Sequence, residues 1–192
     1  LFYDKRNQKF KTSDGFFNSF KTSIPLISDV NTLTNSFESK FFTELYENNI
    51  STLSFFLKSA NSFSNNDIKL SERLFIPSKK LRGFERGRVG PIDGNTYIGG
   101  NYLTSINFTS TLPYLLKDAE NVNLLFFIDA ANLWGVDYDS SLDSQNNINS
   151  SFGLGIDYYS PIGPLSFSFA QPITKNSTDI TETFRFNIGT SF

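Results

Sequence analysis

The side chains able to do chemistry in this chain are carboxylates, cations and amides, because its 192 residues include no Cys and no His. Their absence excludes disulfides, thiolate metal sites, zinc sites and Ser-His catalytic triads. Paired carboxylates remain possible, but none stands out from the charged faces of the predicted strands. The sequence therefore predicts a protein that is not an enzyme and that holds no metal or other cofactor.

One short motif combines a cation with a glycine. Leu81-Arg82-Gly83-Phe84 lies inside the longest predicted loop. On its own the motif is ordinary, since a turn Gly beside a solvated Arg is common. The net charge of −2 indicates no strong nucleic-acid or acidic-partner footprint. The meaning of the motif therefore depends on the elements that position it.

The dominant sequence period is two. Phe37 and Phe41 share one predicted face, whereas Glu38 and Lys40 share the other. Such alternation is typical of strands with one apolar and one polar face. The longest continuous apolar run, Leu124–Ile128, has five residues, whereas a membrane helix needs roughly 18. A helical membrane protein is therefore excluded.

The alternation and the turn signals predict an all-β chain of about nine strands without a confident helix. The predicted strands are Leu1–Arg6, Gly15–Ile27, Asn35–Glu47, Ser51–Ser62, Thr96–Pro113, Val122–Trp134, Ser150–Ser160, Gly163–Ile173 and Thr181–Phe192. The first is a stub, and the chain shows no charged n-region, apolar h-region or cleavage site of a signal peptide. We expect a piece of a longer protein cut at its N-terminal side, with a compact domain beginning at Leu1 as the alternative.

Two architectures fit this pattern. A soluble sandwich or barrel buries the apolar faces, whereas a membrane barrel turns them toward lipid. Aromatic residues near strand ends on the apolar face favour the membrane barrel: Tyr102, Phe108, Trp134, Tyr158, Phe184 and Phe192. Short and long connections also alternate along the chain, as they do in outer-membrane barrels. This antiparallel transmembrane barrel would have its C-terminus in the periplasm and its long loops outside the cell.

Several motifs then fall in a recognisable order. They are Leu81-Arg82-Gly83-Phe84, Gly99-Gly100-Asn101, Phe127–Trp134, Ser160–Leu165 and Phe184–Phe192. In order and spacing they closely resemble the C-terminal barrel half of the BamA family of outer-membrane protein assembly factors, in the bacterial surface antigen superfamily. The specific resemblance covers Lys79 to Phe192. Residues 1–78 match in strand rhythm and in Tyr3-Asp4-Lys5-Arg6.

The resemblance implies a fold, a function and a location. The fold is a barrel of about 16 strands, of which residues 1–192 would be about the last nine of one domain. Periplasmic repeats and the first strands would lie outside this chain. The function is that of the central, non-enzymatic subunit that folds and inserts β-barrel proteins into the outer membrane of a Gram-negative bacterium. Partners would be unfolded β-barrel substrates, outer-membrane lipids and accessory lipoproteins, and not nucleic acid.

The resemblance also implies residue roles in the lumen. Arg82 of the loop would contact the inward Asp129, with Phe127 on the same strand face as a lumen partner. Period two agrees, because it places Asp129 opposite Phe126 and Ile128. Gly83 would permit a sharp turn.

Neighbouring positions complete this expected lumen site. Phe84 would pack against the inner wall beside Leu81. The chain departs from the family in having Ala131 where relatives usually carry Gly, and Asn107 where they often place Glu. We expect Asn107 to act as a neutral helper that accepts a hydrogen bond.

The terminal strand resembles the signal that the assembly machine reads on its substrates. Phe184, Phe186, Ile188 and Phe192 would form its apolar face, and Gly189 would weaken its pairing with the first strand at a lateral gate. The simpler alternative is that Phe192 only anchors the barrel at the membrane interface. Two alternative functions stay open, namely a related barrel that translocates proteins and a passive outer-membrane porin.

Overall fold

The computed structural model is built on one curved antiparallel sheet, and it describes residues 1–9, 11–25, 32–63, 66–115, 121–143, 147–160 and 163–188. In spatial order the strands are β1 (Phe2–Asp4), β2 (Gly15–Ser23), β3 (Thr32–Thr43), β4 (Ser51–Ser62), β7 (Tyr102–Thr111), β8 (Val122–Trp134), β9 (Asn149–Ser160), β10 (Gly163–Thr174) and β11 (Phe184–Ile188). Each pairs with its neighbours along the chain, so the predicted nine-stranded meander is confirmed.

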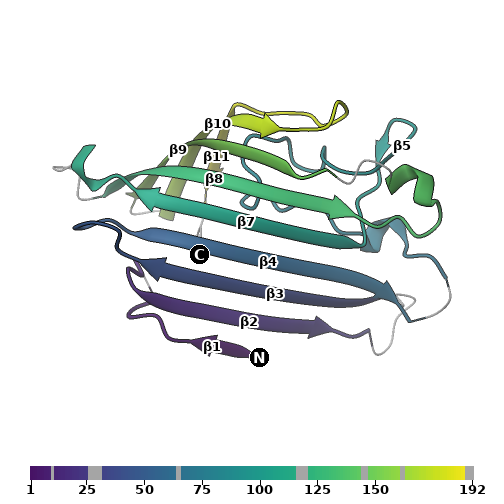
Figure 1. Ribbon diagram of the computed structural model, residues 1–192, viewed down its shortest axis with the longest axis horizontal. Helices are drawn as coiled ribbons and strands as arrows, with labels where there is room; N and C mark the ends of the chain where they lie inside the picture. Colours follow the sequence, from purple (N-terminus) through teal and green to yellow (C-terminus); the bar gives the residue numbers. More distant parts are fainter. Residues whose placement is uncertain are drawn as a thin grey trace.

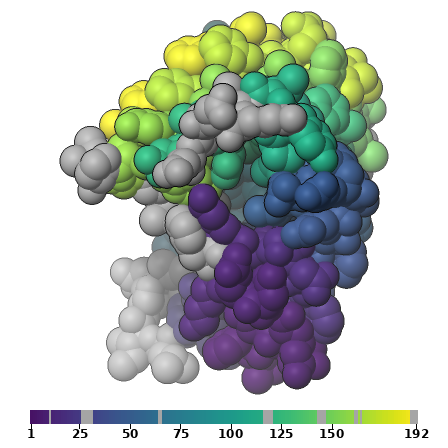
Figure 2. Space-filling view, turned by 90° about the vertical axis from the view of Figure 1, so that its left-hand side faces the viewer, coloured from purple at the N-terminus to yellow at the C-terminus, as the bar shows by residue number. Residues whose placement is uncertain are grey.

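The sheet curls along its length. β9, β10 and β11 turn behind β7 and β8, while β1 to β4 continue the front wall downward (Figure 1). From the side, the wall runs from the purple N-terminal strands at the bottom to the yellow-green C-terminal strands at the top (Figure 2). The sheet therefore has a concave inner face and a convex outer face, as part of a barrel wall does.

The outer face is apolar and exposed. On β9, Phe152 and Leu154 are exposed whereas Gly153 and Gly155 are buried. On β11, Phe186 is 45% exposed and Arg185 is 9% exposed. This lipid-facing pattern is the one expected from period two, and so wide an apolar surface is rare on soluble monomers.

The buried apolar residues gather at one end of the inner face. Ten of them form a single cluster, drawn from strands β4, β7 and β8 and from the connection between β4 and β7. They are Ala60, Ile68, Leu74, Ile76, Leu81, Phe84, Val89, Leu103, Ala131 and Leu133. The core is thus a loop packed onto the inside of the sheet. Among the described residues, no helix is long and apolar enough to cross a membrane.

As expected, the two longest connections lie at the same end of the sheet. The β9–β10 connection covers only residues 161–162, whereas the connection from β4 to β7 covers residues 63–101. The long connection contains the 3-10 helix η1 (Leu70–Glu72) and a small hairpin of β5 (Ile92–Asp93) and β6 (Thr96–Tyr97). The connections after β7 and β8 contain η2 (Pro113–Leu115) and η3 (Ser140–Asp143).

Two strand boundaries were wrong for a physical reason. Thr96 pairs with Asp93 in the hairpin rather than opening β7, because Gly99 at φ +71° breaks the extended chain before Tyr102. Thr181 forms a bridge with Phe84 of the loop, and β11 begins only at Phe184. In both places the chain pairs with the loop instead of the wall.

The remaining strand limits moved by a few residues. The predicted Asn35–Glu47 is observed as Thr32–Thr43, and Gly15–Ile27 ends at Ser23. Ile27, Gly189 and Phe192 lie outside the described residues.

Candidate functional site

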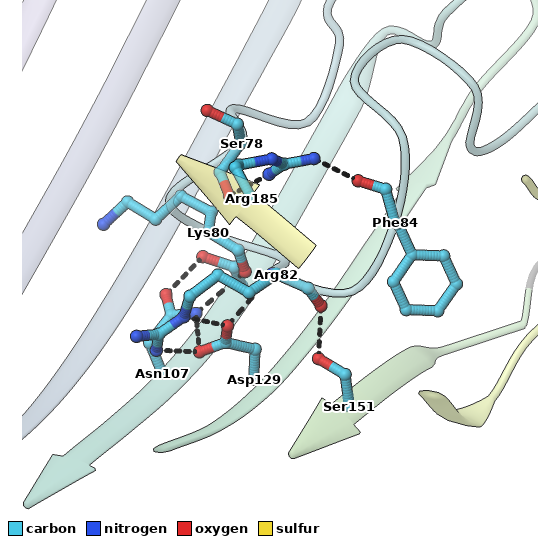
Figure 3. A network of polar contacts seen from close by, with 9 residues as sticks. Ser78, Lys80, Arg82, Phe84, Asn107, Asp129, Ser151 and Arg185 are labelled. Atoms are coloured by element: carbon cyan, nitrogen blue, oxygen red, sulfur yellow. Dashed lines mark hydrogen bonds and ion pairs between the residues drawn. The ribbon is translucent and has the colours of Figure 1, made fainter. Parts of the chain in front are cut away.

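The candidate site is a short arch of the long connection that lies against the inner face of the sheet. We define the arch as residues 78–84, which include the Leu-Arg-Gly-Phe motif. Asn107 on β7 donates to the carbonyl oxygen of Lys80 at 2.8 Å, and Ser151 on β9 donates to that of Arg82 at 2.5 Å. Figure 3 shows the arch over β7, β8 and β9. Side chains of the wall therefore bind the arch through its backbone carbonyl groups.

Arg82 and Asp129 form the centre of the site. The guanidinium Nε and Nη2 donate to the two carboxylate oxygens of Asp129, each at 2.7 Å, and the Arg82 backbone N–H adds a third bond at 3.1 Å. Asp129 is fully buried. A two-pronged, charge-assisted pair of this kind fixes orientation as well as position. The contact expected between these residues is present, while its role in the protein stays a prediction.

Phe127 supports the guanidinium from below. The Arg82 guanidinium carbon lies 3.6 Å from the centroid of the Phe127 ring, which is fully buried. The ring needs space on the neighbouring strand, since a Cβ at Gly153 would lie 2.6 Å from it. Arginine thus contacts a carboxylate at its edge and an aromatic face beneath it.

Asn107 accepts one hydrogen bond and donates two. Its Oδ1 accepts from Ser105 at 3.2 Å, as expected, and its Nδ2 donates to Asp129 at 2.9 Å and to Lys80. The donation to Asp129 was not expected; a buried carboxylate needs donors, and an amide supplies one without adding charge. The neighbouring Ala131 is buried in the apolar cluster.

Gly83 and its neighbours shape the end of the arch. Gly83 adopts φ +87°, a conformation that favours glycine, and a Cβ there would lie 3.0 Å from the Cβ of Ala170. Leu81 and Phe84 are each 2% exposed and belong to the apolar cluster. The motif therefore alternates between apolar anchors and the polar contact of Arg82.

Two further contacts of the arch were not anticipated. Lys80 Nζ forms an ion pair with Glu38 on β3 at 2.6 Å, and Lys40 lies 3.6 Å from the same carboxylate. Period two placed Glu38 and Lys40 on the inner face but could not say which loop residue would meet them. Arg185 on β11 donates to the carbonyl oxygens of Ser78 at 2.9 Å and of Phe84. Because every residue has a backbone carbonyl group, the sequence does not indicate which ones Arg185 would bind.

The connection between β10 and β11 also pairs with the loop. Glu85 N–H donates to the Ile180 carbonyl at 2.9 Å, and Glu182 N–H donates to that of Gly83 at 3.0 Å. Ile180 N–H donates in turn to the Arg88 carbonyl at 3.1 Å. The end of the arch and the residues after it thus form backbone hydrogen bonds, including an isolated β-bridge, with the connection that leads into β11.

The terminal strand presents its predicted apolar face outward. Phe184, Phe186 and Ile188 are all exposed. Among the described residues β11 pairs only with β10, so its other edge carries no strand. Phe186 stacks on Phe167 of β10 with 4.9 Å between ring centroids. The signal and gate roles of these residues and of Gly189 and Phe192 stay predictions.

A polar hollow of about 940 Å³ lies between the arch and the concave face. Its acidic lining residues are Glu38 and Asp157, and its cationic ones are Arg6, Lys9, Lys11, Lys40, Lys79, Lys80, Arg82 and Arg86. The described part of the wall therefore faces a basic, water-accessible interior. Within the described ranges, no cluster of acidic side chains could hold a metal ion.

The chain is similar in sequence to several known proteins. The Omp85 superfamily domain matches residues 1–192. An outer membrane protein assembly factor BamA from Neisseria meningitidis serogroup B is 30% identical over 139 residues, which cover 58% of this chain and 17% of that protein. The BamA of Neorickettsia risticii is 26% identical over all of this chain and 26% of its own length. A SAM50-like protein of Schizosaccharomyces pombe is 27% identical over 69% of the chain and 29% of that protein.

The fold has a solved counterpart. The crystal structure of BamA from Haemophilus ducreyi lacking POTRA domains 1–3 superposes with a TM-score of 0.85 at 23% identity, over 96% of this chain and 40% of that one. The chain thus corresponds to less than half of each of these proteins.

Proposed function

Because the chain belongs to the Omp85 superfamily, we propose that it is the C-terminal part of an integral outer-membrane barrel that folds and inserts other β-barrel proteins. Its bacterial relatives are named outer membrane protein assembly factors. On this proposal the protein is not an enzyme. Its substrates are unfolded outer-membrane β-barrel proteins, and its surroundings are outer-membrane lipids and accessory lipoproteins.

The observation that best supports this function is the seated arch. Arg82, Asp129 and Phe127 fix a long loop inside the barrel wall, where it occupies space that a passive pore would leave open. A loop of this length is far longer than a connection between neighbouring strands requires. Such an arrangement suits a barrel in which the loop in the lumen stabilises the strands that it contacts.

The terminal strand β11 would supply a chemical means once its expected pairing with the first strand of the barrel opens. A strand edge exposes backbone N–H and C=O groups that can add another strand. Phe184, Phe186 and Ile188 on its outer face would keep an incoming strand at the lipid boundary. Insertion would thus proceed by templated strand pairing without any covalent step.

A related activity is favoured by the basic hollow. Its polar lining could admit a translocating chain, as in a protein-translocating branch of the same superfamily. A passive porin is the third alternative. These functions differ in where the substrate finishes: in the membrane, across it, or freely diffusing through it.

The test is reconstitution of the full-length protein in liposomes with an unfolded β-barrel client. Insertion is measured as protease-protected, heat-modifiable client. We expect the wild-type protein to accelerate insertion and Arg82→Ala to slow it about tenfold or more, because the arch loses a charge-assisted pair. Exposed Lys69→Ala in the same connection is the matched control. Client delivered into the liposome interior would support translocation instead, and no effect on the client would contradict both.

A further inference from the structure

Arg185 joins the two ends of the arch to the terminal strand. It lies on the inner face of β11, and only 9% of it is exposed. Its Nη1 donates to the carbonyl of Ser78 at 2.9 Å, and its Nη2 donates to the carbonyl of Phe84. Ser78 and Phe84 begin and end the arch, so a single guanidinium spans its base (Figure 3).

Glu182 fixes the direction of that guanidinium. Its carboxylate accepts from Arg185 Nε at 3.1 Å and from Nη2 at 2.6 Å. Through its own backbone N–H, Glu182 also donates to Gly83 in the arch. The guanidinium of Arg185 is thus oriented by the connection just before β11 while it donates to the arch. A lysine could not reproduce this, since its ammonium is a compact point charge without a rigid fork.

The arch is therefore fastened to the wall at two separate places. Arg82 fastens it to Asp129 on β8, and Arg185 fastens it to β11. In the sheet, β9 and β10 separate these two strands. Among the described residues, β11 pairs with β10 from Phe184 to Ile188. The contacts of Arg185 with the arch are additional to this ladder.

We propose that Arg185 is a positioning residue through which the arch, seated on Asp129, holds the terminal strand in the wall. The two fastenings act as one unit, so loosening either one loosens the other, as reciprocal coupling requires. This coupling follows from the contacts alone. Its meaning for client insertion, in which β11 would open from the first strand and pair with the client, rests on the proposed function.

The test is hydrogen exchange of the full-length protein in proteoliposomes without client. We expect Arg185→Lys to speed exchange of the β11 amides and of the arch amides about tenfold, the effect of losing hydrogen bonds to a charged group. We expect Asp129→Asn to speed exchange of β11 by a similar factor, although β8 does not touch β11. Asn187→Ser is the matched control, since it lies on the same face of the same strand and should leave the arch unchanged.

The double variant decides between coupling and two local effects. If the arch transmits the effect, Asp129→Asn adds nothing to β11 exchange in the Arg185→Lys background. Arch amides that loosen in Asp129→Asn while β11 stays protected would overturn the proposal, as would additive effects on β11. Heat modifiability shows which variants fold. If Arg185→Lys does not fold, the exchange of β11 in Asp129→Asn alone tests the proposal. Since no client is present, this result is separate from that of the insertion assay.

Discussion

At the scale of single residues, the site depends on how the buried Asp129 carboxylate is solvated. It accepts hydrogen bonds from the backbone N–H, Nε and Nη2 of Arg82 and from Nδ2 of Asn107. These fixed donors replace the water that a carboxylate loses on burial. Any change that removes a donor leaves charge uncompensated.

This arrangement predicts non-additive effects of substitution. We expect Arg82→Ala and Asp129→Ala each to destabilise the full-length barrel by about 3 kcal/mol, because each leaves a desolvated partner. The double variant should be less damaging than the sum by about 0.5–3 kcal/mol. The measurement is a double-mutant cycle on the heat-modification midpoint. Strict additivity would mean that the pair does not contribute as a pair.

A second residue-scale prediction concerns acid pH at the loop end of the barrel. Burial raises the pKa of Asp137. The hydrogen bond from the Ile68 backbone N–H and the charge of the Arg73 guanidinium together lower that pKa by more, so it lies below the ordinary value of 3.8. Because the folded pKa is depressed, this contribution to stability is present above pH 3.8 and is lost as pH falls through the lowered value.

The Ile68 amide reports this titration directly, since it donates to Asp137 at 2.7 Å. In full-length protein labelled with ¹⁵N-isoleucine, its chemical shift should titrate with a midpoint below 3.8. Asp137→Asn should abolish the transition. A midpoint at or above the ordinary value would contradict the assigned contact.

Sequence reasoning reached part of this site. Period two placed Asp129 inward, and the family motif supplied Arg82 as its partner. Arg185 was also on the inward face by alternation, but its acceptors on Ser78 and Phe84 are backbone carbonyls, which every residue has. The pairing of Lys80 with Glu38 depends on the path of the loop through space, which local pattern does not encode.

At the scale of elements, the position of a residue along its strand sets its expected depth in the membrane. On β9 the outward residues Leu154, Ile156 and Tyr158 step from the strand centre toward the short-turn end. We expect Leu154→Arg to destabilise the barrel by about 2–4 kcal/mol and Ile156→Arg to do so by less, because the penalty falls toward the interface. Equal costs would show that β9 does not cross lipid in this direction.

The control for this series is an inward substitution. Thr109 on β7 lines the hollow. Thr109→Arg should cost little, since its cation can reach water in the interior. The measurement is again the heat-modification midpoint, in liposomes of one composition.

Strands were predictable where one face is apolar over their whole length. β4 and β8 were placed residue for residue, because turn signals bound both strands. The hairpin of β5 and β6 was missed because two-residue strands have no period to detect. The start of β11 was misplaced because Thr181 continues the alternation yet pairs with the loop.

At the scale of the whole molecule, the two ends of the wall differ. The two longest connections, β4–β7 and β8–β9, share one end, where the apolar cluster packs (Figure 1). We propose that the long end faces outward from the cell. The chain contains no Cys, so single cysteines report this orientation cleanly.

Two cysteine variants test it. Ser71→Cys lies in the long connection and Lys9→Cys in the β1–β2 turn, and both positions are exposed. A polyethylene-glycol maleimide added to intact cells should label Ser71→Cys alone. Lys9→Cys should react only once the outer membrane is permeabilised. The reverse pattern would invert the orientation.

The tight contact between Gly83 and Ala170 has a consequence for how the sequence can change. Gly83→Ala meets three obstacles: the 3.0 Å approach to Ala170, a 3.3 Å approach to Ser151, and the φ of +87°, which costs an L-residue about 1–2 kcal/mol. Ala170→Gly removes the first obstacle only. Alone, it should destabilise β10, since Gly weakens a strand interior. In the Gly83→Ala background it should stabilise.

This reversal is sign epistasis, and heat-modification midpoints of the four proteins measure it. Ala170→Gly should lower the midpoint of the wild-type protein and raise that of Gly83→Ala, without restoring it fully because the backbone strain persists. The same sign in both backgrounds would show that the arch can shift away from β10. If the signs differ, substitutions at these two positions are viable in one order and not in the other.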